Sequence, residues 1–113
     1  MTVFEKIAAR QIPAEIIYES EEFLAFRDLH PQAPVHALIV PKRCIPRIAE
    51  ARAESDAMVL GQMLCAAAEV ARRLGVAESG FRLVINNGPD AGESVPHLHI
   101  HLLGGRSLAW PPG

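Results

Sequence analysis

The 113-residue sequence has little of several features that define large classes of proteins. It holds only two cysteines, Cys44 and Cys65, and their separation matches neither a disulfide framework nor a zinc-ligand motif. No apolar run approaches the roughly 20 residues that span a bilayer, and the N-terminus lacks the basic start and apolar core of a signal peptide. We therefore expect a reduced, cytoplasmic protein with no membrane partner.

An excess of charge of one sign is also missing. The net charge is −2 with histidines neutral, and no more than two basic residues are consecutive. The sequence thus lacks the electrostatic footprint of tight nucleic-acid binding, and we expect no nucleic-acid partner. A glycine-rich phosphate loop followed by lysine is likewise absent.

What is present predicts a single domain over residues 1–113. Thr2 and Glu5 have the spacing of a capping box, which predicts a short helix from Thr2 to Arg10. Apolar residues recur at intervals of three and four from Ser55 to Leu74, which predicts one long amphipathic helix.

The remaining pattern predicts an antiparallel sheet of about five strands. Strands are expected at residues 15–19, 22–28, 35–40, 81–86 and 95–103, with a tight hairpin at Ser20-Glu21. Because strands and helices do not alternate along the chain, an α+β meander is favoured over a doubly wound sheet.

The most informative stretch runs from Val95 to Leu103. Three of the five histidines, His97, His99 and His101, alternate there with aliphatic residues. Alternate residues of a strand share one face, so the three imidazoles should point the same way while the aliphatic side chains pack on the other face. Three histidines in this register by chance would be rare, about one case in a hundred by composition alone.

The row of three alternating histidines, taken alone, is compatible with two kinds of chemistry. It could bind zinc, with His36 as a possible fourth ligand, because catalytic zinc sites do use three histidines. It could instead supply a nucleophile, because a neutral imidazole is nucleophilic at neutral pH. The preceding loop favours the second reading: Asn86, Gly92 and Ser94 provide an amide, free backbone N–H groups and a hydroxyl that suit a phosphoryl group.

His97-Leu98-His99-Ile100-His101-Leu102-Leu103 fits the pattern His-φ-His-φ-His-φ-φ and resembles the motif of the histidine triad (HIT) superfamily. The chain is similar to the Hint branch, the purine nucleoside phosphoramidases. The similarity extends over nearly the whole chain, through Ile12-Pro13-Ala14, Phe26-Arg27-Asp28, Pro31-Gln32-Ala33-Pro34-Val35-His36, Val40-Pro41-Lys42, Gly104-Gly105-Arg106 and Trp110-Pro111-Pro112-Gly113.

The resemblance implies a HIT-like fold and hydrolysis of a purine nucleoside 5′-phosphoramidate or aminoacyl adenylate, without a metal or other cofactor. His99 would be the nucleophile and would form a covalent nucleotidyl-histidine intermediate. His101 would carry protons and contact phosphate, and His97 with His36 would support them. Nδ1 of His99 would be held by a backbone carbonyl near His97.

The resemblance also assigns residues to nucleotide binding. Asn86 and Ser94 would contact the phosphate or the leaving group, close to Gly92, and Asp28 would accept hydrogen bonds from the ribose hydroxyls. The purine slot would be lined by Val3, Phe4, Ile7, Ile12, Phe26 and Leu29; from the sequence alone, the aliphatic members would be ordinary core residues.

Three positions depart from the family pattern. Glu93 stands where glutamine is frequent, and its carboxylate would repel an anionic substrate unless it points to solvent. Pro96 replaces an aromatic residue and is compatible with the first residue of a strand. His30 has no counterpart among the catalytic residues and is expected to be a solvated turn residue.

The resemblance further implies a homodimer whose sheets join across the two-fold axis, with the long helix and the tail at the interface and Trp110 reaching toward the partner's site. A competing hypothesis is a nucleotide-binding regulatory protein in which hydrolysis is incidental; Glu93 keeps it open.

Overall fold

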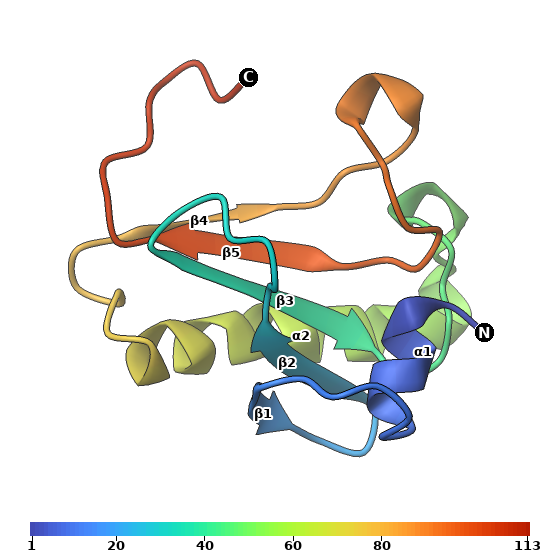
Figure 1. Ribbon diagram of the computed structural model, residues 1–113. Coiled ribbons are helices and arrows are strands. Elements are labelled where there is room, and N and C mark those ends of the chain that lie inside the picture. Colours follow the sequence, from blue (N-terminus) through green and yellow to red (C-terminus); the bar gives the residue numbers. More distant parts are fainter.

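The computed structural model describes all residues from 1 to 113 and consists of two α-helices and one five-stranded sheet (Figure 1). Neighbouring strands are antiparallel throughout, in the order β1-β2-β3-β5-β4. The predicted α+β architecture is therefore confirmed. The elements are α1 (Val3–Ala8), β1 (Ile16–Glu19), β2 (Phe23–Arg27), β3 (Val35–Pro41), α2 (Ala53–Arg73), β4 (Phe81–Val84) and β5 (Ile100–Gly104), with 3-10 turns at Ile48–Glu50 and Pro89–Ala91.

The first helix, α1, forms because its first turn satisfies its own backbone. The Thr2 hydroxyl accepts the Glu5 N–H at 3.1 Å, and the Glu5 carboxylate accepts the Thr2 N–H at 2.8 Å, which confirms the predicted capping box. The helix ends at Ala8 rather than at the expected Arg10, because Arg10 adopts a left-handed backbone conformation with φ of 62°.

The long helix α2 begins at Ala53, earlier than the predicted Ser55. Its first turn is held by the buried Asp56 carboxylate, which accepts the Arg52 N–H at 2.8 Å and pairs with Arg43. At the other end Gly75 takes a φ of 76°, which stops the helix. Neither α2 nor α1 combines the length and the hydropathy that crossing a membrane requires.

The two faces of the sheet bury different clusters. Alternate residues of the strands, among them Ala25, Ile39 and Ile100, pack with the apolar stripe of α2, and the residues between them, among them Leu24, Leu38 and Val40, pack with α1. Figure 1 shows α2 running along the sheet and α1 close to the end of β3. Because Leu98 and Leu102 belong to the α2 cluster, the alternating histidines face the α1 side, as the period of two predicts.

The extent of the histidine strand was predicted wrongly. Regular pairing begins only at Ile100, so His97 and His99 lie in the segment before β5, in which the backbone bends at residues 95–97. In that segment the His97 N–H bonds to the Val95 carbonyl at 2.8 Å and the Leu98 N–H bonds to Ile45 at 2.6 Å, outside any ladder. Pro96 is therefore not the first residue of a strand; its missing N–H falls where no sheet partner is needed.

Smaller boundaries differ as well, and β1, β2 and β3 each differ by one residue at one or both ends. The fourth strand, β4, stops at Val84 instead of Asn86. The link between β1 and β2 is Ser20–Glu22, longer than the predicted Ser20-Glu21, because the Ser20 hydroxyl accepts the N–H groups of Glu22 and Phe23, both at 3.3 Å.

Candidate active site

Four of the five histidines converge on the α1 side of the sheet. His36 comes from β3, His101 from β5, and His97 and His99 from the segment that enters β5. The ring centroids of His99 and His101 lie 4.9 Å apart, and those of His36 and His101 lie 5.1 Å apart. His30 is exposed in a turn, where its N–H donates to Asp28 at 2.8 Å, so it lies outside this group as expected.

His97 is fixed by both of its ring nitrogens. Nε2 lies 2.7 Å from the Pro41 carbonyl, which can only accept, so Nε2 carries the proton and Nδ1 accepts the Thr2 hydroxyl at 2.7 Å. The side chain is fully buried, and burial lowers the pKa of His97. His97 is therefore a neutral ring that is hydrogen-bonded at both nitrogens.

The same reasoning gives the tautomer of His99. Its Nδ1 lies 2.7 Å from the His97 carbonyl oxygen and must carry the proton, which leaves a lone pair on Nε2. The ring is only 7% exposed, and the edge-on ring of Phe4 packs against it at 5.0 Å. The expected contact between Nδ1 and a carbonyl near His97 is present, and it leaves the Nε2 lone pair without a partner in the protein.

His36 determines the proton positions of His101. Nδ1 of His36 accepts the Gln32 N–H at 3.0 Å, so Nε2 is the donor, and it faces Nδ1 of His101 at 2.9 Å. His101 consequently carries its own proton on Nε2. Burial, followed by the neighbouring His99 and His36, lowers the pKa of His101 to about 4. Burial also lowers the pKa of His36, although the Asp28 carboxylate lies 3.4 Å from its Nε2.

The carboxylate of Glu93 neither points to solvent nor stands free. Arg47 donates to it from Nε at 3.0 Å and from Nη2 at 3.1 Å, and the Gly88 N–H donates to it at 2.9 Å. These contacts, led by Arg47, lower the pKa of Glu93. The repulsion expected from this residue is therefore offset by a guanidinium that the sequence did not single out.

The residues predicted to line the purine slot have different surroundings. Phe4, Ile7 and Phe26 are buried together in the cluster on the α1 side, with Ile12 packed at its edge. Leu29 is 76% exposed, and Val3 is also at the surface. Of the remaining residues predicted to contact nucleotide, half-buried Asp28 lies beside His36, with its carboxylate 3.4 Å from Nε2. Asn86 is half-buried, and Gly92 and Ser94 are exposed in the loop before the histidines.

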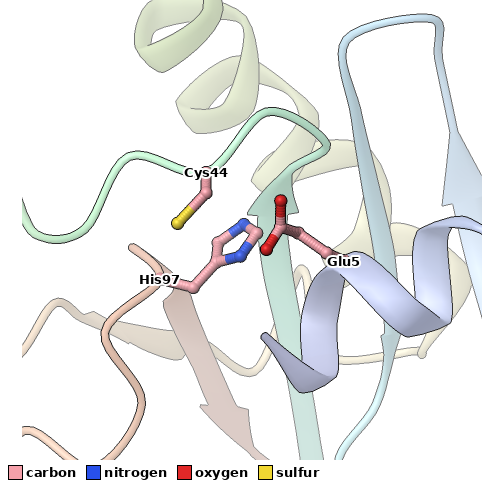
Figure 2. Close-up of side chains that lie close together, drawn as sticks. All are labelled: Glu5, Cys44 and His97. Carbon is pink, nitrogen blue, oxygen red and sulfur yellow. The ribbon is translucent and has the colours of Figure 1, made fainter. Parts of the chain in front are cut away.

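The zinc alternative depends on which donor atoms lie close together. Two triples bring their possible ligand atoms within 4.8 Å of one another, Asp28–His36–His101 and Glu5–Cys44–His97 (Figure 2). Neither triple is the row of three alternating histidines. Both ring nitrogens of His36 and of His97 are already engaged in hydrogen bonds, so as arranged these imidazoles offer no free lone pair, and the donor sets do not fit a zinc ion.

One surface groove lies away from the histidines. It encloses about 830 Å³ between α2 and the β1–β2 hairpin and includes Tyr18, Phe23 and Met58. Because Phe23 packs on the α2 face of the sheet, this groove opens on the side opposite to the imidazoles.

The sequence missed three residues that hold the site, namely Gln32, Pro41 and Arg47. Two of them, Gln32 and Pro41, act through backbone groups, which leave no signal in residue type. The guanidinium of Arg47 is separated by 46 positions from the carboxylate it binds, so only the fold brings the pair together.

Comparison with known proteins agrees with this geometry. The HIT domain family matches residues 9–108. An uncharacterized HIT-like protein of Synechococcus elongatus is 56% identical over 99% of this chain and 96% of its own length. A 14 kDa zinc-binding protein of Zea mays is 49% identical over 99% of this chain and 88% of its own. The crystal structure of a HIT family hydrolase from Legionella pneumophila superimposes with a TM-score of 0.95 at 44% identity, covering all of both chains. With its four converging histidines, this chain belongs to the HIT domain family.

Proposed function

We propose that the protein hydrolyses the P–N bond of purine nucleoside 5′-phosphoramidates, with aminoacyl adenylates as related substrates, through a covalent intermediate on His99. The observation that carries this proposal is the contact of 2.7 Å between Nδ1 of His99 and the His97 carbonyl. It fixes the tautomer in which Nε2 is unprotonated, and it orients a buried imidazole without a carboxylate.

The chemistry follows from these proton positions. Nε2 of His99 attacks the α-phosphorus, the P–N bond breaks, and the amine departs with a proton from solvent. The phosphorylated ring is then cationic, and its Nδ1–H donates a stronger hydrogen bond to the His97 carbonyl. Water attacks the phosphorus in a second step, the N–P bond to His99 breaks, and one proton returns to solvent, which releases the nucleoside monophosphate and restores neutral His99.

His101 serves in this scheme as a hydrogen-bond donor to a phosphoryl oxygen. Its Nδ1 accepts from His36 at 2.9 Å, so Nε2–H is the group free to meet the substrate. With a pKa lowered to about 4, the ring stays neutral at physiological pH and donates without carrying a formal charge. Of the two roles expected for His101, phosphate contact is favoured over proton transfer.

The family relationship and the surrounding residues support the assignment of the nucleotide site. The HIT family hydrolase of Legionella pneumophila is similar over its full length. In this proposal Asp28 binds the ribose hydroxyls, and Ser94 and Asn86 contact the phosphate or the leaving amine. Gly92, which has no side chain, lets the backbone of the loop come close to the phosphate. The purine rests against the edge of the apolar cluster that contains Phe4 and Ile12.

The test compares wild-type protein with His99→Ala on adenosine 5′-phosphoramidate. Loss of the nucleophile should reduce turnover by about a thousandfold or more, while AMP binding measured by calorimetry is retained. His30→Ala is the matched control, because this exposed histidine should leave turnover unchanged. Turnover by His99→Ala comparable to wild type would refute the proposal. Slow wild-type turnover combined with tight AMP binding would favour the nucleotide-binding regulatory role instead.

A second measurement tests metal independence. Chelator treatment should leave turnover unchanged, because the donor sets at Asp28 and at Cys44 already use their imidazole nitrogens in hydrogen bonds. Stoichiometric zinc in the purified protein, lost together with activity on chelation, would contradict this prediction.

A further inference from the structure

The hydroxyl of Thr2 connects the start of α1 to the histidine cluster. Its oxygen accepts the Glu5 N–H at 3.1 Å, and its proton goes to Nδ1 of His97 at 2.7 Å. The proton has no alternative in this geometry, because Nε2–H of His97 is committed to the Pro41 carbonyl at 2.7 Å. One oxygen atom therefore serves as helix cap and as the partner of a fully buried imidazole.

The contacts continue from His97 to His99. The residue whose ring is held by Thr2 presents its carbonyl to Nδ1 of His99 at 2.7 Å. Phe4, two positions after Thr2, packs edge-on against both rings, at 5.5 Å from His97 and 5.0 Å from His99. The first turn of α1 thus contacts the proposed nucleophile directly through Phe4 and indirectly through Thr2.

Neighbouring side chains keep Thr2 in place. The Glu5 carboxylate accepts the Thr2 N–H at 2.8 Å, which fixes the backbone from which the hydroxyl projects. Figure 2 shows the Glu5 carboxylate of α1 and the Cys44 thiol of the segment after β3 close to the His97 ring. The thiol donates to the Pro96 carbonyl at 3.5 Å, so it too holds the segment that carries His97.

We propose that Thr2 is a positioning residue for the nucleophile, acting through His97. This inference rests on the proposed function, since it assigns His99 the attacking role. Without the hydroxyl, Nδ1 of a buried imidazole loses its only donor, and a buried acceptor without a partner is destabilising. The His97 ring would turn toward another donor, and its carbonyl would no longer hold His99 Nδ1 in the same direction.

The kinetic experiment uses the untagged full-length chain. Thr2→Val, which keeps the shape and removes the hydroxyl, should lower kcat about tenfold with KM nearly unchanged. Thr2→Ser should restore kcat. The matched control is Ser20→Ala, which removes a hydroxyl that caps the β1–β2 link far from the histidines and should leave kcat unchanged. If Thr2→Val disturbs the packing around α1, Thr2→Ala is used as a second variant that also lacks the hydroxyl.

A second readout does not require turnover. In ligand-free protein labelled with 15N-histidine, the His99 Nδ1 proton should give a protected NMR signal, which Thr2→Val shifts or exposes to exchange and Thr2→Ser preserves. An unchanged signal together with unchanged kcat in Thr2→Val, or a Thr2→Ser variant as impaired as Thr2→Val, would overturn the inference. Should wild-type protein fail to cleave the phosphoramidate, the proposed function fails, and the NMR signal alone decides whether Thr2 positions His99.

Discussion

Arg47 compensates the Glu93 carboxylate, which precedes Ser94 of the proposed phosphate site, and it is the main cause of the lowered pKa of Glu93. Its guanidinium bonds to both oxygens of Glu93, and Glu93 in turn accepts the Gly88 N–H and bonds through its own N–H to the Gly88 carbonyl. The pair therefore closes the loop that leads to Ser94 and removes the charge conflict that Glu93 alone would create.

Variants that remove the charge of Arg47, of Glu93 or of both test this compensation. Arg47→Met should weaken AMP binding about three- to fivefold, because the carboxylate of Glu93 is then unpaired beside an anionic ligand. Glu93→Gln alone should change binding little, and the double variant should bind as well as Glu93→Gln. The measurement is calorimetry at low and physiological salt. Additive losses in the double variant would show that Arg47 acts other than through Glu93.

At the scale of residues, the sequence predicts which side chains come together at the site, but it does not predict which nitrogen of each imidazole carries the proton. The histidine row, His36 and Asp28 were found from spacing and family resemblance, and the structure brings them together. The tautomers depend on backbone groups of Gln32, Pro41 and His97. Every residue has such groups, so only the fold reveals which of them meet an imidazole.

At the scale of elements, α2 anchors the sheet through one narrow stripe. Met63, Ala67 and Val70 of this helix are at most 1% exposed, whereas Met58 on the same helix is 75% exposed. Burial of the stripe, rather than helix propensity, determines how the element docks.

The two methionines of α2 give a matched comparison. Met63→Ala should lower the free energy of unfolding by about 2–5 kcal/mol, because it leaves a cavity in the core. Met58→Ala should change it by less than about 0.5 kcal/mol. Urea denaturation followed by circular dichroism checks both values. Equal losses from the two variants would contradict the orientation of the helix.

Helices and strands with their own local signals were predicted from the sequence, and the segment that enters β5 was not. The capping box and the apolar stripe are readable within a few turns, so α1 and α2 were found within about two residues at each end. Residues 95–99 alternate like a strand, but their backbone bonds go to Val95 and Ile45 rather than to a ladder. Periodicity reports which side is buried and does not report the hydrogen-bond partner.

At the scale of the whole molecule, three histidines with lowered pKa values make stability depend on pH. Burial lowers the pKa values of His36 and His97 and brings that of His101 to about 4, below the ordinary value of 6.5. Between about pH 4 and pH 6.5 the unfolded chain binds more protons than the folded one. The contribution of these histidines to the free energy of unfolding is therefore fully present above about pH 6.5 and falls as the pH drops toward 4.

The corresponding measurement is the urea midpoint at pH 7.5 and at pH 5. The midpoint should be lower at pH 5, and His101→Gln should reduce the difference because one depressed histidine is removed. Carboxylates such as Asp56 and Glu69, whose pKa values are lowered by arginine partners, stabilise the fold above their ordinary values of 3.8 and 4.5 and lose this contribution only as the pH falls below those values. A midpoint that does not change between pH 7.5 and 5 would contradict the burial of these imidazoles in the native state.

Assembly is the remaining property of the whole molecule. We expect a homodimer joined through the free edge of β4, with α2 and the tail nearby. The sheet ends at β4, Ile85 continues that edge at 38% exposure, and Arg82 of β4 holds the tail by donating to the Ala109 carbonyl at 3.0 Å. An unpaired edge with an exposed apolar residue is suited to pairing with a second copy.

Light scattering should therefore give a mass close to twice the 12.3 kDa of the chain. Ile85→Lys should shift the protein toward monomer, because the ammonium would be brought into the paired edge. Ile48→Lys is the matched control, since Ile48 is also 38% exposed but lies in the 3-10 turn at residues 48–50. A monomeric wild-type protein at micromolar concentration would exclude the dimer, and a dimer that both variants leave intact would place its interface elsewhere than the β4 edge.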